Sequence, residues 1–409
     1  MTGTGSGDRL TDRAVNRATL ARQHLLQRQE ASARDEIAHL AGMQAQAPLA
    51  PYVGLWTRLE SFATKELSAL YERREVVRLA LMRGTIHLVT AQDALAWRAL
   101  VEPVITRGTD AAFGKHYSGL DRDAVVEAAR ELTEQAPRTF AELGPLLAER
   151  FPGRDPAALA QLARARLPLI QIPPRGVWGA TGRIAHTTAR AWLGDERAAQ
   201  RGQTPEPREL DQLVRCYLAA FGPATIMDAQ AWSGLTKLRE VFDRLAPALR
   251  TFTAENGAQL YDLPNAPRPA PDAPAPARFL PEYDNLLFSH ADRTRVNPSN
   301  HRIPLFPGNG AALGYYLLDG TWHGLWRIDR PRKPKKQAKG GQSATTVTTS
   351  TTAAARREQA RGEVRLTIQP FTPLTATARD QLTTEGRNLL AFLAPDAASA
   401  DIQFAPATS

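Results

Sequence analysis

One pattern constrains the fold more than any other: three stretches of the first 263 residues show helical periodicity followed by two short apolar runs around a turn. In the first stretch these runs are 76–81 and 85–89, and Gly84 lies between them. Apolar residues spaced three and four apart predict helices, and short Val/Ile/Leu runs around a glycine turn predict a β-hairpin. The helices of this stretch are expected near 15–26, 35–43, 52–62 and 67–71.

The second stretch repeats the order. Its β-type runs are 169–172 and 177–180, on either side of a Pro-Pro-Arg-Gly turn that contains Arg175. Its helices are expected at 124–133, 139–149 and 156–164, and Thr139 with Glu142 three residues later predicts a capping box.

The third stretch ends in the clearest hairpin signal. Asn256-Gly257 separates the apolar runs 249–252 and 260–263, and Asn-Gly is the pair that a tight hairpin turn prefers. Its helices are expected at 210–221, 224–232 and 235–245.

Helices closed by a hairpin are the outline of a winged helix, so an α+β fold of three tandem winged-helix units is predicted at 1–118, 119–205 and 206–263. In such a unit one helix enters the major groove of DNA while the hairpin lies along the phosphates. Arg83 and Arg175, at the predicted hairpin turns, are where phosphate contacts would form. Winged helices also serve as protein–protein modules, and that alternative stays open.

The remaining chain divides into a linker and a β-rich domain. Seven prolines between 264 and 281 predict a stiff extended linker. A C-terminal β-rich domain at 282–400 follows, with strands near 312–318, 322–328 and 363–368 and a closing helix at 375–392. The low-complexity tract 333–362 predicts a disordered insertion whose basic start either contacts DNA or is simply solvated.

Composition narrows the function. Fifty-one Lys and Arg residues against 42 Asp and Glu give a net charge of +9, which favours an anionic partner such as nucleic acid. A general excess of arginine without binding meaning is the alternative. Cys216 is the single cysteine, so a disulfide framework or a multi-cysteine metal site is excluded, and Cys216 is expected to be an inert apolar residue.

Motifs for other enzyme classes are missing from the sequence. It contains no phosphate-binding loop, no complete dinucleotide-binding fingerprint, no His-Glu-x-x-His and no Gly-x-Ser-x-Gly. We therefore expect no metal and no cofactor. The absence of a long apolar stretch or a secretory signal leads us to expect a cytoplasmic, nucleoid-associated monomer that does not bind membranes.

One short motif is a candidate for chemistry: Gln44-Ala45-Gln46, just before Pro48. Proline favours extended backbone before it, and in extended chain alternate side chains point the same way. Gln44 and Gln46 would then face one site while Ala45 points into the core. From composition alone, surface or helix-capping amides are the better explanation of the pair.

The chain resembles the bacterial winged-helix DNA glycosylases of the AlkZ/YcaQ family. The resemblance covers roughly residues 10–395, and its motifs are short but occur in the same order. They are LAGMQAQ at 40–46, LWTRL at 55–59, MRGTIHLV at 82–89, FGPAT at 221–225, WSGL at 232–235, LPEYDNLL at 280–287, DR at 292–293 and DGTWHGLW at 319–326.

The resemblance implies that Gln44 and Gln46 are the catalytic pair, in the branch of the family with two glutamines. It implies three winged helices plus a β domain, double-stranded alkylated DNA as partner, and removal of cationic N-alkylated purines, including antibiotic adducts and interstrand crosslinks, as repair and self-resistance. Besides Arg83 and Arg175 at the hairpin turns, the candidate DNA contacts are Thr85 and His87, on one face of a strand beside the proposed site, and Arg293.

Several of these residues have simpler interpretations. Thr85 and His87 could be structural hydrogen-bonding residues of the hairpin, and Asp284 with Asn285 could fix a turn. Asp292 could pair with Arg293 instead of leaving it for DNA. For the whole chain, a non-catalytic winged-helix DNA-binding regulator and an interaction scaffold are the alternatives to a glycosylase.

Overall fold

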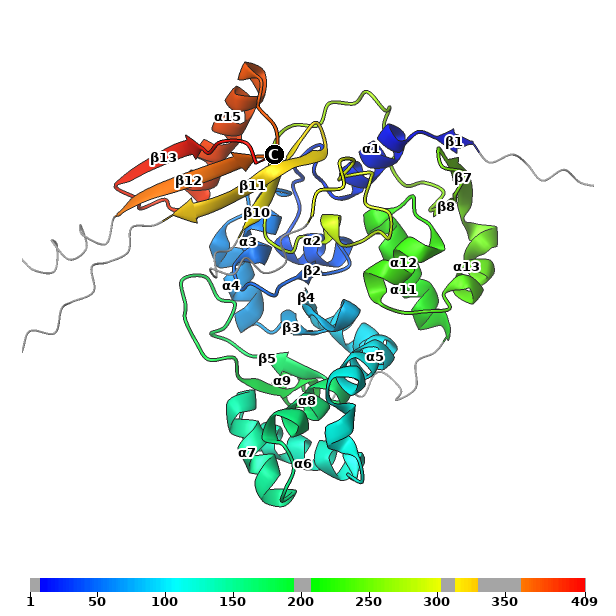
Figure 1. Ribbon diagram of the computed structural model, residues 1–409, viewed down its shortest axis with the longest axis vertical. Helices are drawn as coiled ribbons and strands as arrows, with labels where there is room; N and C mark the ends of the chain where they lie inside the picture. The colour runs from blue at the N-terminus through cyan, green and yellow to red at the C-terminus, as the bar shows by residue number, and fades with distance from the viewer. Residues whose placement is uncertain (1–7, 195–206, 303–312, 330–361, 409) are drawn as a thin grey trace, which may run out of the picture. The chain divides into compact units, whose positions relative to one another are not determined.

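A computed structural model of the chain describes residues 8–194, 207–302, 313–329 and 362–408 (Figure 1). It divides into two compact units, one of residues 1–275 and 281–303, the other of residues 276–280 and 304–409. Segment 281–303, which the sequence analysis places in the C-terminal domain, therefore groups with the first unit.

A five-stranded sheet lies in the middle of the first unit. Its strand order is β2 (Met43–Gln44), β4 (Ile86–Thr90), β3 (Val76–Ala80), β5 (Leu169–Gln171) and β6 (His186–Thr188). Strands β3 and β4 form the predicted antiparallel hairpin, joined by the short 3₁₀ helix η1 (Met82–Gly84). Because β3 also pairs with β5, the first two predicted winged-helix units share one sheet. The count of three separate units stays a prediction.

The predicted partner strand at 177–180 is wrong. Leu169–Gln171 pairs instead with His186–Thr188, so Arg175 lies in a loop that spans 172–185. Prolines 173 and 174 have no N–H to donate, so the ladder cannot continue there. The loop contacts the N-terminal helical region of the chain: the Tyr52 hydroxyl donates to the carbonyl of Gly176 in the loop over 2.8 Å.

The helices of the first unit follow the predicted order. The first four are α1 (Asp12–Arg22), α2 (Ala33–His39), α3 (Ala50–Trp56) and α4 (Thr64–Glu72). The next four are α5 (Ala91–Phe113), α6 (Arg122–Gln135), α7 (Phe140–Arg150) and α8 (Pro156–Arg166). Thr139 and Glu142 form the predicted capping box at the start of α7. The 23-residue α5 was not predicted.

The third stretch is confirmed in outline. Its helices are α11 (Pro207–Phe221), α12 (Ile226–Ser233) and α13 (Arg239–Leu245), followed by β7 (Arg250–Ala254) and β8 (Gln259–Asp262). The two strands are antiparallel, with Gly257 at φ +83° in their turn. Residues of this stretch share one apolar core with the central sheet and α5, in which Trp97, Tyr217 and Trp232 are buried. Helices α6–α8 have a core of their own.

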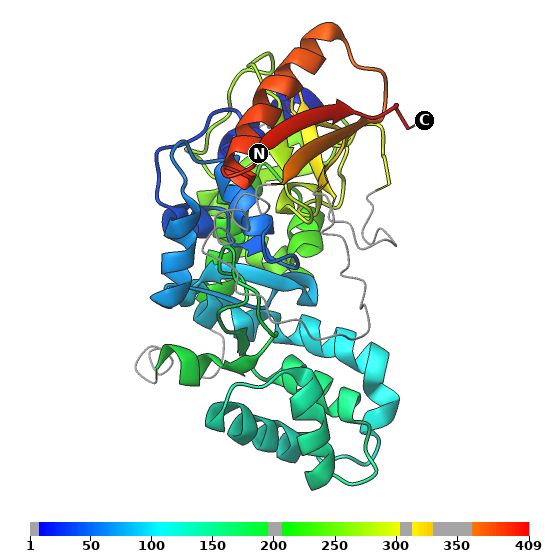
Figure 2. The ribbon, with the colours of Figure 1, turned by 90° about the vertical axis from the view of Figure 1, so that its left-hand side faces the viewer.

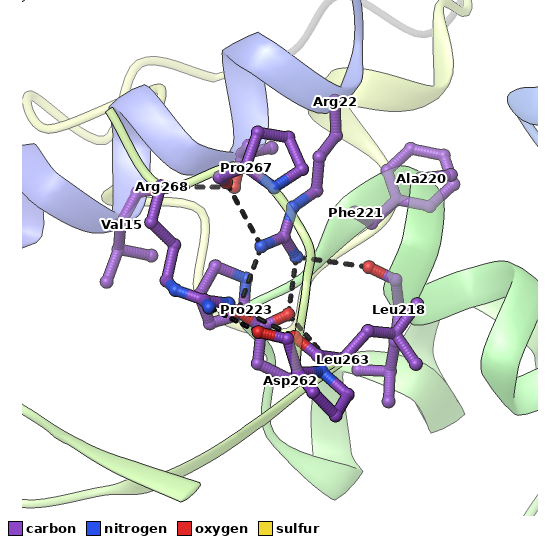
Figure 3. Close-up of polar contacts among 12 residues, drawn as sticks. Val15, Arg22, Leu218, Ala220, Phe221, Pro223, Asp262, Leu263, Pro267 and Arg268 are labelled. Atoms are coloured by element: carbon purple, nitrogen blue, oxygen red, sulfur yellow. Dashed lines mark hydrogen bonds and ion pairs between the residues drawn. The ribbon is translucent and has the colours of Figure 1, made fainter. Parts of the chain in front are cut away.

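The proline-rich segment is tied to the first unit as far as Ala275. Arg22 of α1 is fully buried and donates two hydrogen bonds to Asp262, of 2.7 and 2.9 Å, and one to the Pro267 carbonyl (Figure 3). Arg268 of the segment meets the same carboxylate at 2.5 Å. A doubly paired buried aspartate thus links α1, β8 and the segment predicted to be a linker.

The second unit is an antiparallel sheet with one added parallel strand. Its order is β13 (Ser399–Phe404), β12 (Glu363–Pro370), β11 (Thr321–Asp329), β10 (Gly314–Leu318) and β9 (Arg278–Leu280). Helix α15 (Ala376–Leu393) packs against β9, β12 and β13 (Figure 2). The strands 314–329, the Asp319-Gly320 turn and the closing helix are confirmed; β13 was not predicted. The expected insertion at 333–362 lies, except for Gly362, outside the described residues.

Candidate active site

The Gln44-Ala45-Gln46 motif runs along β4. Gln44 is opposite His87 in the antiparallel pair, and the Ala45 N–H donates to the Ile86 carbonyl over 2.8 Å. The Ala45 side chain is completely buried. Strand β2 ends at Gln44, and Gln46 lies in a bend, so the expected common face of the two glutamines stays a prediction.

Both glutamine amides bind the same short turn. The Gln44 Oε1 accepts a hydrogen bond of 2.9 Å from Arg83, and the Gln46 Oε1 accepts one of 3.3 Å from the Ile86 N–H. Gln44 is 8% exposed, whereas Gln46 is exposed. The structure therefore brings both glutamines to the 83–86 turn. Gln44 is the buried member of the pair and Gln46 is the exposed one.

Arg83 is held by the protein rather than projecting from a hairpin tip. It has left-handed backbone (φ 56°, ψ 15°) and is half-buried. Its second amino group donates to the Trp232 carbonyl over 2.5 Å, at the C-terminal end of α12, where a cation is favoured. Burial, with a smaller contribution from the charge of Arg293, lowers the pKa of Arg83 to about 10. The guanidinium thus stays protonated at neutral pH.

A second arginine binds the backbone of the Gln44-Ala45-Gln46 motif. Arg78 of β3 is 1% exposed and donates to the Ala45 carbonyl over 2.6 Å. Its Nε and Nη1 are buried and have no hydrogen-bond partner among the described residues. Burial lowers its pKa. Arg78 was not among the residues predicted for the site. The feature of the sequence that could have indicated it is a charged residue inside an otherwise apolar strand.

The side chains of Thr85 and His87 form hydrogen bonds within the protein. The Thr85 hydroxyl donates to the Met82 carbonyl over 3.1 Å, and the His87 Nδ1 lies 3.2 Å from the Thr85 carbonyl. His87 is 0% exposed, and its burial lowers its pKa to about 3. A neutral, fully enclosed imidazole favours the structural interpretation over contact with DNA.

Segment 281–303 closes the inner side of the motif. The Asn285 amide donates to the Gly42 carbonyl over 3.2 Å, just before the motif, and Asp284 forms two hydrogen bonds of 2.8 and 2.9 Å with Arg58. Asp284 also accepts from the Leu286 N–H, so the expected turn is present. Local sequence patterns gave no sign of the ion pair with Arg58, because its partners are 226 residues apart.

A cavity of about 10 Å³ lies on this inner side, which is roughly the space of one water molecule. Gln44, Arg58, Asp284 and Asn285 are among the residues that line it. The Asn285 Oδ1 is buried and has no hydrogen-bond partner within the described parts of the chain. The floor of the site is therefore polar and tightly enclosed.

The two remaining predicted DNA contacts differ in position. Arg293 is exposed, lies 5.8 Å from the Phe288 ring and acts electrostatically on Arg83. Asp292 accepts hydrogen bonds from Thr294. Arg175 lies in the 172–185 loop, where its charge acts on Arg78. The charges of the two arginines thus act on different arginines, Arg293 on Arg83 and Arg175 on Arg78.

Within the described residues, no group of three or more His, Cys, Asp or Glu side chains could hold a metal ion. None of the helices described has both the length and the apolar character needed to cross a membrane.

Comparison with known proteins identifies the family of this chain. The family model "DNA glycosylase AlkZ-like" matches residues 37–392. The chain is 27% identical over 340 residues to the interstrand DNA cross-link repair glycosylase of Streptomyces sahachiroi, covering 76% of this chain and 85% of that protein. The solved structure of Streptomyces sahachiroi DNA glycosylase AlkZ has the same fold, with a TM-score of 0.68 and 18% identity over 97% of this chain and 100% of that one.

The family match covers most of the chain, including the glutamine motif, the η1 turn and segment 281–303. The fold agrees over nearly the full length of both chains. The protein therefore belongs to the AlkZ-like family of DNA glycosylases.

Proposed function

We propose that this glycosylase hydrolyses the N-glycosidic bond of cationic N-alkylated purines in double-stranded DNA, with N7-alkylguanine as the simplest substrate. Bulky adducts and interstrand crosslinks belong to the same chemical class, and the similar Streptomyces protein is named for cross-link repair. The product is an abasic site, and the biological role is repair, including self-resistance to DNA-alkylating compounds.

One observation carries this proposal: two uncharged amides, Gln44 and Gln46, are fixed side by side against the 83–86 turn. The nearby carboxylate of Asp284 is already paired with Arg58. Among the described contacts, no carboxylate hydrogen-bonds to either amide. The two amides can therefore orient a water molecule.

The chemistry of a cationic purine suits such a site. Alkylation gives the base a positive charge, so it leaves without being protonated first. Water attacks C1′ of the deoxyribose, the C1′–N bond breaks, and its electron pair neutralises the departing base. The attacking water loses a proton to solvent. An oxocarbenium-like transition state needs an oriented water.

We assign the two glutamines different tasks in this step. Gln46, at the surface, binds and orients the water; Gln44, beside it at the floor, aligns that water or contacts the sugar-phosphate. We further propose that Arg293, which is exposed and whose charge acts on Arg83, binds a DNA phosphate.

The test is base release from a duplex that carries one N7-alkylguanine, followed by cleavage of the resulting heat-labile abasic site. Wild-type protein is expected to release the base, and the double variant Gln44→Ala/Gln46→Ala to release it at least about 100-fold more slowly, the scale of a lost positioning effect. Equal rates would refute the assigned roles. A protein that shifts a DNA fragment without releasing base would be a regulator, and one without salt-dependent DNA affinity a scaffold.

A further inference from the structure

We infer that Arg83 is a positioning residue that fixes the direction of the Gln44 amide, so that Gln44 acts as a hydrogen-bond donor and Gln46 as the acceptor. The inference rests on the proposed function and divides its two glutamines into unlike roles. It replaces the expectation that Arg83 is a phosphate contact.

The direction of the Gln44 amide follows from the chemistry of its partner. The oxygen and nitrogen of an amide are hard to tell apart by position alone. A guanidinium, however, carries only donors, so the Gln44 atom 2.9 Å from the Arg83 Nη2 must be the oxygen. The Gln44 NH₂ group is consequently turned away from Arg83.

Arg83 is well placed to hold this orientation. Its other amino group is bonded to the Trp232 carbonyl, and no carboxylate pairs with it among the described residues. Its backbone lies 3.3 Å from where a Cβ of Gly234 would be, so the turn and the end of α12 are in close contact. The guanidinium bridges α12 and β2 and cannot swing away without losing both bonds.

The charge of Arg83 also weakens Gln44 as an acceptor. A carbonyl oxygen that already faces a cation has its electron density drawn towards that cation, while the N–H groups of the same amide become better donors. Gln44 is thus suited to donate to an oxygen, either of the attacking water or of the sugar-phosphate.

Gln46 is in the opposite situation. Its oxygen accepts one longer bond, 3.3 Å, from a neutral backbone N–H, and the side chain is exposed. A carbonyl oxygen has two lone pairs, so one remains for a water hydrogen. Because the partner is again a pure donor, the Gln46 oxygen is also fixed towards the turn.

Paired Gln→Glu substitutions test this division, since each keeps the size of the side chain. Gln44→Glu retains the bond to Arg83 but removes both N–H donors, and we expect base release to fall at least about 100-fold. Gln46→Glu retains the acceptor oxygens, and we expect a rate within about fivefold of wild type, since a carboxylate accepts at least as well. Equal losses in both variants, or the reverse order, would overturn the inference.

A double-mutant cycle then asks whether Arg83 acts through Gln44. Arg83→Gln should slow single-turnover release about 10- to 100-fold when Gln44 is present, and by less than about threefold in a Gln44→Ala background. Guanidinium added to Arg83→Ala should restore part of the lost rate. Losses of the same size in both backgrounds would show that Arg83 acts independently of Gln44.

DNA binding separates this role from a phosphate contact. If Arg83 positions Gln44, the slope of log affinity against log salt is unchanged in Arg83→Gln; a lost phosphate contact lowers that slope by about one. Arg293→Gln, expected to lower the slope, is the matched control. The Gln→Glu pair leaves Arg83 intact, so it remains decisive if Arg83 variants fold poorly. Failure of wild-type protein to release any base would refute the proposed function itself.

Discussion

At the scale of single residues, the site depends on buried charges that each have a defined neighbour. The Arg58–Asp284 pair is nearly inaccessible, with side chains 1% and 4% exposed, and it joins the residues just after helix α3 to segment 281–303, beside the cavity that Gln44 also lines. Removing one member of such a pair leaves the other charge buried without compensation, which costs far more than the net contribution of the intact pair.

We therefore expect Asp284→Asn to lower the free energy of unfolding by about 3–5 kcal/mol. Urea titration followed by tryptophan fluorescence measures the change. Glu127→Gln is the matched control, because its pair with Arg130 is exposed on both sides and should contribute little. An equally small effect of both substitutions would contradict the role given to the buried pair.

The site could be predicted from the sequence only in part. The buried Ala45 and the exposed Gln46 agree with a local alternation of the motif, although the strand itself ends at Gln44. Arg58, Arg78 and the Trp232 carbonyl are brought to the motif by strands and helices far away in the chain, and no local pattern encodes those approaches. Arg83 and His87 were predicted to contact DNA because of their positions in a hairpin. The sequence did not indicate the burial of these two side chains.

At the scale of elements, a glycine within a helix is required only where a neighbouring backbone packs against it. In α7, a Cβ on Gly144 would lie 2.6 Å from the Pro156 carbonyl oxygen of α8, so the backbones touch there. In α5, a Cβ on Gly108 would meet nothing within 4 Å, and glycine only weakens that helix.

The same substitution should thus have opposite effects in the two helices. Gly144→Ala is expected to lower the free energy of unfolding by roughly 1–3 kcal/mol through overpacking. Gly108→Ala should raise it by roughly 0.5–1 kcal/mol through helix propensity. Thermal and urea unfolding of both variants measures this, and stabilisation by Gly144→Ala would show that α7 and α8 are less tightly packed than described.

Elements with local signals were predicted well. The capping box of α7, the Asn-Gly hairpin and the Asp319-Gly320 turn each carry their own chemistry in a few residues. The strand at 177–180 failed because two prolines end the ladder and the true partner, His186–Thr188, lies beyond a long loop. Strand β13 pairs in parallel with β12, and such pairing leaves no turn signal.

At the scale of the whole molecule, the first unit encloses several histidines in neutral form. Burial lowers the pKa of His87 and His290 to about 3 and that of His186 to about 4. In the unfolded chain these rings titrate near 6.5. Between those values the unfolded state binds more protons, so the folded state loses stability as the pH falls.

Lowering the pH from 7.5 to 5 is therefore expected to cost about 2 kcal/mol of unfolding free energy for each of these histidines. Urea unfolding at both pH values measures the loss. In His87→Gln, the difference in unfolding free energy between pH 7.5 and pH 5 should be smaller by about 2 kcal/mol. A stability that is constant or increases towards pH 5 would contradict the assignment of buried neutral rings.

Long-range links also decide how the proline-rich segment behaves. Its composition predicts an extended connector, but the segment contains turns at 264–265 and 271–272. Arg22 and Arg268 bind it to Asp262 and thereby to α1 and β8. Composition could not show that two arginines share one buried carboxylate. The grouping of 281–303 with the first unit has the same kind of cause, since Asp284 and Asn285 are bound to Arg58 and Gly42.

The most direct test of the central claim is single-turnover release of an N7-alkylated guanine from duplex DNA by wild-type protein and by Gln46→Ala, with DNA affinity measured on the same samples. We predict release by wild type, a loss of at least about 100-fold in the variant at unchanged affinity, and no release of unmodified guanine by either. Equal release by the two proteins, or release of uncharged guanine, would contradict a mechanism in which neutral amides direct water at a sugar with a cationic leaving group.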